Sequence, residues 1–222
     1  ILKKGMLSMT APMIYELRRP AQMETGKTYP ALFLLHGIGS NEQNMLPLVE
    51  GLENHFFIFS IRGHLPQPPG YAFFTIEGYG KPHRKVFDEG VKKLTSFIDY
   101  ACGQYPIDEH QLFLLGFSQG AILSMTLGLT LGSRIKSIVA LSGYIPAFVK
   151  EEYNIKPVND LSIFISHGEM DQVLPFEWGV ANDEYFRKLG ATVTFRTYPV
   201  GHTVSVENHQ DFIKWISEQL EK

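Results

Sequence analysis

The chain has one cysteine, Cys102, among its 222 residues. A single thiol excludes an internal disulfide bond and a cysteine-rich metal site, and it favours a reducing, cytoplasmic compartment. Basic residues are no more abundant than acidic ones, since 20 lysines and arginines stand against 23 aspartates and glutamates. Proteins that bind nucleic acid need a strongly basic surface to neutralise phosphates, so we expect no nucleic-acid partner.

Long hydrophobic runs are also missing. The longest purely apolar segments are short, such as 31–35, whereas a membrane-spanning helix needs about 20 apolar residues. The first residues include two lysines but no apolar stretch after them, which does not fit a secretory signal. We therefore expect no stable membrane insertion. We also expect Met6 or Met9 to be the biological start and residues 1–9 to precede the folded part of the chain.

The remaining composition is that of an ordinary globular protein, with 44% apolar and 19% charged residues. This is too hydrophobic for a disordered chain and too mixed for a coiled coil. The length fits one full-sized domain, which we expect to span 10–222. The sequence is compatible with a homodimer.

Two periodicities alternate along the chain. Short apolar runs rich in β-branched and aromatic residues predict buried strands, and longer runs with helical spacing predict helices between them. The predicted strands are 30–35, 56–61, 111–115, 137–142, 161–166 and 192–198, with a more polar edge strand at 13–18, and the predicted helices are 86–103, 119–131, 177–189 and 206–220. This order predicts an α/β fold with a mainly parallel central sheet and helices on both faces.

Residues 64–84 break the alternation, because they are rich in proline, glycine and aromatic side chains. The segment is too long and irregular for an ordinary connection. It is either a wall of a binding pocket or a surface excursion whose aromatic side chains fill a satellite core. About twenty residues are too few to fold as a separate cap domain.

The central motif is Gly116-Phe117-Ser118-Gln119-Gly120, which has the form G-x-S-x-G. It follows an apolar strand directly and precedes a helical run directly, which is the setting of a nucleophile elbow. Small residues on both sides allow the strand and helix to approach, and the helix N-terminus favours a developing negative charge. We therefore predict that Ser118 is a nucleophile.

A serine hydroxyl needs a base, and the base needs a carboxylate that orients it. Of the eight histidines, His202 has the most suitable position, between the last predicted strand and the last predicted helix. Loops at the carboxyl ends of parallel strands are where such sheets place their sites. Asp171 follows another strand end, and Glu169 is its nearest alternative. We predict Asp171 as the acid.

An oxyanion hole requires two preorganised N–H donors. The backbone of Gln119, directly after the predicted nucleophile, is one candidate. The other is Ile38, in the glycine-containing loop 36–40 that follows the first buried strand. This loop has no lysine of the kind that a phosphate-binding loop requires.

Together these motifs resemble the phospholipase/carboxylesterase family of the α/β-hydrolases. The matching segments are Leu34–Gly39, Gly116–Ala121, Leu141–Pro146, His167–Pro175 and Gly201-His202. The resemblance implies an α/β-hydrolase fold, a triad of Ser118, Asp171 and His202, oxyanion donors at Ile38 and Gln119, and neither a metal nor a diffusible cofactor.

By this resemblance we predict a serine carboxylesterase that acts on small esters. Because the segment 64–84 can wall only a shallow apolar pocket, we expect acyl chains of about two to eight carbons. Acyl-protein thioesterase or lysophospholipase activity at the same site is the alternative. A non-catalytic binding protein of this fold would have a damaged triad, and a serine peptidase would need an additional domain. Apolar side chains that are candidates for an acyl pocket, or for plain packing, are Phe73, Phe74, Ile145, Phe148, Phe176 and Trp178.

Overall fold

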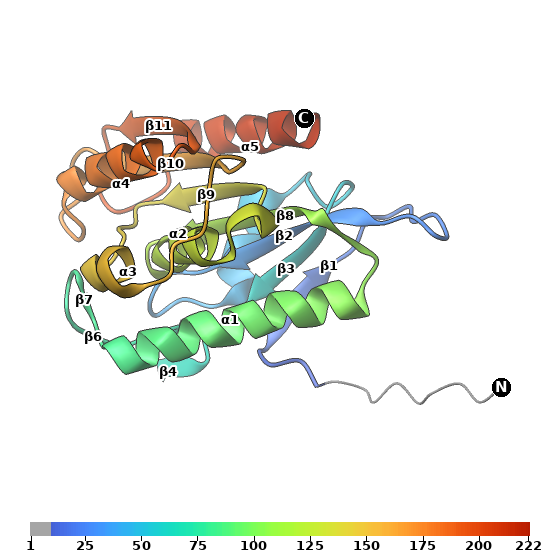
Figure 1. Ribbon diagram of the computed structural model, residues 1–222, viewed down its shortest axis with the longest axis horizontal. Coiled ribbons are helices and arrows are strands. Elements are labelled where there is room, and N and C mark those ends of the chain that lie inside the picture. The colour runs from blue at the N-terminus through green and yellow to red at the C-terminus, as the bar shows by residue number, and fades with distance from the viewer. Residues whose placement is uncertain (1–9) are drawn as a thin grey trace.

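The computed structural model describes residues 10–222, so the predicted N-terminal segment 1–9 lies outside the described residues. A seven-stranded sheet with the order β1-β3-β2-β8-β9-β10-β11 forms its centre (Figure 1). Its strands are β1 (Tyr15–Arg18), β2 (Tyr29–Leu35), β3 (Phe57–Ile61), β8 (Ile107–Phe117), β9 (Ser137–Leu141), β10 (Ser162–Gly168) and β11 (Thr192–Tyr198). Only β1 runs antiparallel to its neighbour. The prediction of a mainly parallel sheet is confirmed.

Helices cover both faces of this sheet, as predicted (Figure 1). They are α1 (Arg84–Gln104), α2 (Gln119–Leu131), α3 (Ala147–Glu152), α4 (Phe176–Lys188) and α5 (Val206–Leu220), with 3₁₀ helices η1 (Glu42–Val49) and η2 (Gly132–Arg134). The sequence did not predict α3 or η1, because each is too short to show a helical period. Within residues 10–222, no helix is long and apolar enough to cross a bilayer.

Alternation along the strands creates two hydrophobic cores. In β2, Ala31, Phe33 and Leu35 pack with side chains of α1 to α4, whereas Leu32 and Leu34 pack with those of η1 and α5. Successive side chains of a strand point to opposite faces, so a strand covered on both faces must be apolar throughout. This explains why the buried strands are continuous apolar runs.

The segment 64–84 forms two small hairpins between β3 and α1. They are β4 (Leu65–Gln67) with β5 (Gly70–Ala72), and β6 (Ile76–Gly78) with β7 (Lys81–Pro82). The first hairpin is tied to the loop after β2, because Gly39 N–H donates to the Tyr71 carbonyl and Tyr71 N–H donates to the Ser40 carbonyl, both at 2.8 Å. The insertion therefore lies at the carboxyl end of the sheet, beside the predicted site.

Candidate active site

Ser118 occupies a sharp turn between β8 and α2. Its φ of 53° and ψ of −116° lie in a region of backbone conformation that residues other than glycine rarely adopt. A Cβ atom on Gly116 would lie 2.2 Å from the carbonyl carbon of Gly120, and one on Gly120 would lie 1.9 Å from the carbonyl oxygen of Leu35. Only glycine fits at these two positions, so the motif is a steric requirement of the turn.

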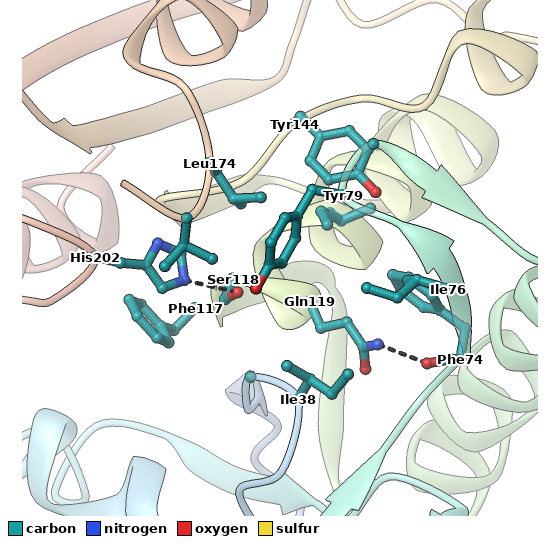
Figure 2. Close-up of a pocket in the computed structure, with 14 residues that line it drawn as sticks. Ile38, Phe74, Ile76, Tyr79, Phe117, Ser118, Gln119, Tyr144, Leu174 and His202 are labelled. Atoms are coloured by element: carbon teal, nitrogen blue, oxygen red, sulfur yellow. Dashed lines mark hydrogen bonds between the residues drawn. The ribbon is translucent and has the colours of Figure 1, made fainter. Parts of the chain in front are cut away.

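The structure brings Ser118, His202 and Asp171 into one hydrogen-bonded chain. The Ser118 Oγ lies 2.9 Å from His202 Nε2, and His202 Nδ1 lies 2.7 Å from Asp171 Oδ2. The three residues come from separate elements, since Ser118 follows β8, Asp171 follows β10 and His202 follows β11. Figure 2 shows the imidazole of His202 directed at the serine hydroxyl. Their positions match the spatial order expected of nucleophile, base and orienting acid.

The surroundings of Asp171 keep its carboxylate ionised. Its Oδ1 accepts hydrogen bonds from the N–H groups of Val173 at 2.8 Å and Leu174 at 2.9 Å. Burial raises the pKa of Asp171, but the hydrogen bonds from His202 and from these two N–H groups outweigh burial and lower the pKa below its ordinary value. Glu169, the alternative acid, is exposed and accepts from the Thr197 hydroxyl instead.

A second histidine lies beside this carboxylate, and the sequence analysis missed it. His167, buried at the end of β10, has its Nε2 3.0 Å from the Leu174 carbonyl oxygen and 3.4 Å from Asp171 Oδ2. A carbonyl only accepts, so Nε2 carries the proton. Burial lowers the pKa of His167, which favours the neutral ring. Its spacing of four residues from Asp171 was the available signal.

The loop after β2 is held by another buried histidine. His36 Nδ1 lies 2.7 Å from the Gly37 carbonyl oxygen, and Gly63 N–H donates to His36 Nε2 at 2.9 Å. These two bonds require a neutral ring with its proton on Nδ1, and burial lowers the pKa of His36 accordingly. Because a trans peptide directs C=O and N–H oppositely, the bond to Gly37 also fixes the direction of the Ile38 N–H.

Both candidate oxyanion donors adjoin Ser118. Within residues 10–222, the Ile38 N–H has no hydrogen-bond acceptor, and the Gln119 N–H lies in the first turn of α2, where intrahelical acceptors are missing. Ile38 and Gln119 also line the cavity at Ser118. Free N–H groups beside a nucleophile are suited to bind an oxyanion.

The side chain of Gln119 joins this turn to the insertion. Its Oε1 accepts from the Phe73 N–H at 2.8 Å. Its Nε2 donates to the Phe74 carbonyl at 2.6 Å, and Figure 2 shows this second bond. Gln119 is buried. The Phe73 N–H and the Phe74 carbonyl therefore depend on its side chain for their hydrogen bonds. No pattern of residues along the chain indicates this pair of bonds.

A cavity of about 150 Å³ opens at Ser118. The insertion forms one side of it with Phe74, Ile76, Tyr79 and Gly80, and Figure 2 shows Tyr79 projecting toward Ser118. The remaining apolar wall comes from Ile38, Phe117, Ile122, Tyr144, Val173 and Leu174. The cavity is therefore mainly apolar, and the hydrogen-bonded pair of Ser118 and His202 lies in its wall.

Of the predicted acyl-pocket residues, Phe74 lines this cavity. Phe73, Ile145 and Trp178 do not line it, so for the cavity at Ser118 the prediction is wrong for these three residues. Phe73 is fully buried behind the wall, with its ring centroid 4.8 Å from that of His36. Ile145 and Trp178 line a neighbouring cavity. Apolar character located the region, but it did not indicate the direction of each side chain.

The other two aromatic candidates also lie outside the cavity at Ser118. Phe148 packs edge-on against Phe87 at 5.2 Å between ring centroids, and Phe176 lies edge-on to His167 at 6.2 Å. They contribute to packing, which was the alternative reading. Tyr79 and Ile76, which do line the cavity, were noted only as part of the irregular segment.

In the described part of the chain, the single thiol is not activated and no cluster of metal-binding side chains is found. Burial raises the pKa of the half-buried Cys102 to about 11, so its thiol stays protonated at neutral pH. Across residues 10–222, no group of three or more histidine, cysteine or acidic side chains is arranged to hold a metal ion.

Comparisons with known proteins agree with this architecture. The family model of phospholipases and carboxylesterases matches residues 21–220. The chain is 31% identical to acyl-protein thioesterase 1 of Candida albicans, over 93% of this chain and 98% of that protein. It is 32% identical to acyl-protein thioesterase 1 of Debaryomyces hansenii, over 69% of this chain and 68% of that protein.

Among solved structures, the carboxylesterase of Bacillus cereus superposes with a TM-score of 0.83, at 23% identity over 93% of this chain and 94% of that one. The carboxylesterase of Mesorhizobium loti gives a TM-score of 0.79 at 21% identity, over 93% and 95% of the two chains. At these identities the structures establish the fold, and the sequence matches establish the relationship. The chain belongs to the phospholipase/carboxylesterase family and is a serine hydrolase with the α/β-hydrolase fold.

Proposed function

We propose that the protein is a carboxylesterase that hydrolyses esters with short to medium acyl chains through an acyl-enzyme on Ser118. The observation that carries the proposal is the chain of two hydrogen bonds, 2.9 Å and 2.7 Å, that links Ser118 Oγ to His202 and His202 to Asp171. Free N–H groups of Ile38 and Gln119 at the same cavity support it.

In the acylation step, Ser118 Oγ attacks the ester carbonyl carbon while His202 Nε2 takes its proton. The carboxylate of Asp171 holds the Nδ1–H of His202 and stabilises the imidazolium that forms. The N–H groups of Ile38 and Gln119 bind the oxygen that becomes negative in the tetrahedral intermediate. The imidazolium then gives its proton to the leaving alcohol as the C–O bond breaks.

In the deacylation step, water attacks the acyl-enzyme with His202 again as the base. The tetrahedral intermediate collapses, the acid leaves, and the proton returns to Ser118 Oγ. The triad and the oxyanion donors therefore act in both the acylation and the deacylation step.

The cavity size sets the expected chain length. Pockets for drug-sized ligands measure about 300–1,000 Å³, whereas the cavity at Ser118 measures about 150 Å³. Each buried CH₂ contributes about 0.8 kcal/mol, so affinity rises with chain length only until the cavity is full. We expect the optimum between about two and eight acyl carbons, without activation at an oil–water interface, since the insertion is a pair of short hairpins.

A thioester substrate is the second candidate, because the relatives named above are called acyl-protein thioesterase 1. The attacked carbonyl and the acyl-enzyme are the same for both substrates, so the geometry at Ser118 serves either. A thiol also leaves more readily than an alcohol because its pKa is lower, about 8.5. Lysophospholipase activity would require the same attack on a larger substrate.

The test is a series of kcat/KM values for p-nitrophenyl esters from acetate to palmitate, with matched acyl thioesters, below and above the solubility limit of each substrate. We expect a maximum at or below eight carbons and a smooth dependence on concentration. An optimum at sixteen carbons, or a jump in rate on emulsification, would contradict the chain-length proposal. A uniform preference for thioesters at every chain length would favour the second candidate.

A further inference from the structure

A second cavity adjoins the one at Ser118. It measures about 190 Å³, and the two cavities share Gly80 and Tyr144 as lining residues. Beyond this shared border it extends between α3 and α4, where Ile145 and Trp178 form apolar walls. The second cavity therefore lies next to the substrate space at Ser118, across Gly80 and Tyr144.

One charged side chain lines this second cavity. Lys150, on α3, is half-buried, and every other residue that lines the cavity is uncharged. The Lys150 ammonium lies 5.0 Å from the centre of the Tyr185 ring, and within residues 10–222 no carboxylate lies within 4.0 Å of it. Burial lowers the pKa of Lys150. A partly desolvated cation without a counter-ion is costly unless an anion binds beside it.

The walls of this cavity are held in place by buried polar contacts. Asn182, on α4, accepts from the Ile145 N–H at 3.2 Å and donates to the Gly143 carbonyl at 2.9 Å. Trp178 packs edge-on against Tyr144, at 4.8 Å between ring centroids. These contacts join α4 to the segment before α3, so the cavity exists before a ligand arrives, and little ordering is needed on binding.

We infer that the second cavity is a subsite for a carboxylate at the far end of the substrate, held by the Lys150 ammonium. The preferred substrates are then esters that carry a second, ionised carboxyl group. The inference rests on the proposed ester hydrolysis at Ser118 and specifies its substrate class. The carboxylate belongs either to the acyl part, as in a half-ester of a dicarboxylic acid, or to the alcohol part, as in an acylated hydroxy acid.

The experiment compares charged and neutral substrates of matched length. The acyl arm pairs mono-p-nitrophenyl adipate and suberate with p-nitrophenyl hexanoate and octanoate. The alcohol arm pairs the acetate ester of 6-hydroxyhexanoate with hexyl acetate, followed by proton release. The readout is the ratio of kcat/KM for the charged substrate to that for its neutral partner. We expect this ratio to reach about ten in at least one arm, as a charge-assisted contact allows.

Variants of Lys150 identify the source of the preference. Lys150→Met, which removes the charge, is expected to bring the ratio close to one. Lys150→Arg is expected to keep most of it, and Lys150→Glu to reverse it. The matched control is Lys85→Met, since Lys85 is an exposed lysine of α1 that lines neither cavity.

Two results would overturn the inference. The first is a ratio near or below one in both arms for the wild-type protein. The second is a preference for charged esters that remains in the Lys150→Met variant. A purely structural role of Lys150 would lower both rates and leave the ratio unchanged. If neither the neutral nor the charged esters are hydrolysed, the proposed function itself fails, whereas equal rates on neutral and charged esters reject only the subsite.

Discussion

The turn at Ser118 and the insertion at 64–84 meet at one cavity, but they are built differently. At the turn, any Cβ atom on Gly116 or Gly120 would collide with backbone, so a single conformation is imposed. The insertion consists of two short hairpins, and Tyr79 near the tip of the second is 63% exposed. The reactive groups thus follow the ends of sheet strands, whereas the element that shapes the substrate space is an insertion attached to the sheet.

The two regions are connected by a small number of polar contacts. Gln119 lines the cavity from the turn, while its side chain bonds to Phe73 and Phe74 of the insertion. His36 similarly bonds within the loop after β2 and to Gly63, just before the insertion. Changes at the turn should therefore alter the chemical step, and changes at the connection should alter substrate binding.

The largest expected effect is at the turn. Ser118→Ala should fold normally and lose esterase activity by about 10³-fold or more, because the acyl-enzyme no longer forms. The matched control is Ser124→Ala, which changes a buried serine of α2 outside the cavity and should keep its activity. Retention of more than about a tenth of the activity by pure Ser118→Ala protein would rule out Ser118 as the nucleophile.

The next effect concerns the acid. Asp171→Asn should lower kcat by about 10² to 10⁴, because an amide offers His202 no charge and can favour the wrong tautomer. Glu169→Gln is the control, since Glu169 bonds to Thr197 and not to His202. Steady-state kinetics of both variants decide the matter, and a larger loss in Glu169→Gln would reassign the acid.

A smaller effect is expected where the two regions join. Gln119→Met keeps the side-chain volume and the backbone N–H but removes both bonds to the insertion. Unpaired buried groups cost about 1–3 kcal/mol each, so the insertion should shift and KM for a butyrate ester should rise about tenfold, with less change in kcat. A loss confined to kcat would show that the side chain acts on the chemical step instead.

The smallest effect is a dependence of stability on pH. Burial lowers the pKa of His36, His64 and His167 below the ordinary value of 6.5. In the unfolded chain these rings bind protons first, so the free energy of unfolding falls as pH drops below about 6.5. Thermal unfolding should show a nearly constant midpoint from pH 8 to 7 and a fall of several degrees by pH 5.

A variant sharpens this last prediction. Neither ring nitrogen of His64 has a hydrogen-bond partner within residues 10–222, so His64→Leu should remove one of the three groups without breaking a bond. Its midpoint should vary less with pH than that of the wild type. An equal or steeper variation would show that other groups govern the acid limb.

Sequence reasoning was most successful where structure follows from period and sterics. The bounds of α2, α5 and β11 match the predicted ranges, because their apolar spacing is regular and their ends are marked by glycine, serine or a loop. The prediction for β8 was too short, because residues 108–110 near its start are polar and two of them, Glu109 and His110, are exposed. Ser118, Asp171 and His202 could be selected because each follows a strand end.

The substrate side could not be read in the same way. Phe73 and Phe74 are adjacent in sequence and have identical side chains, yet of the two only Phe74 lines the cavity at Ser118. The direction of each side chain depends on the bonds from Gln119 and on the hairpin geometry, which no period encodes. The surroundings of Lys150 likewise come from α4, which begins more than twenty residues later in the sequence.

The central claim is that Ser118 alone forms the covalent intermediate. Its most direct test is reaction of the wild-type protein with a fluorophosphonate, followed by intact-mass measurement and peptide mapping. The account predicts one adduct per chain, on the peptide that contains Ser118, and none in the Ser118→Ala variant. An adduct on a different residue, or no adduct on a folded protein that hydrolyses esters, would contradict it.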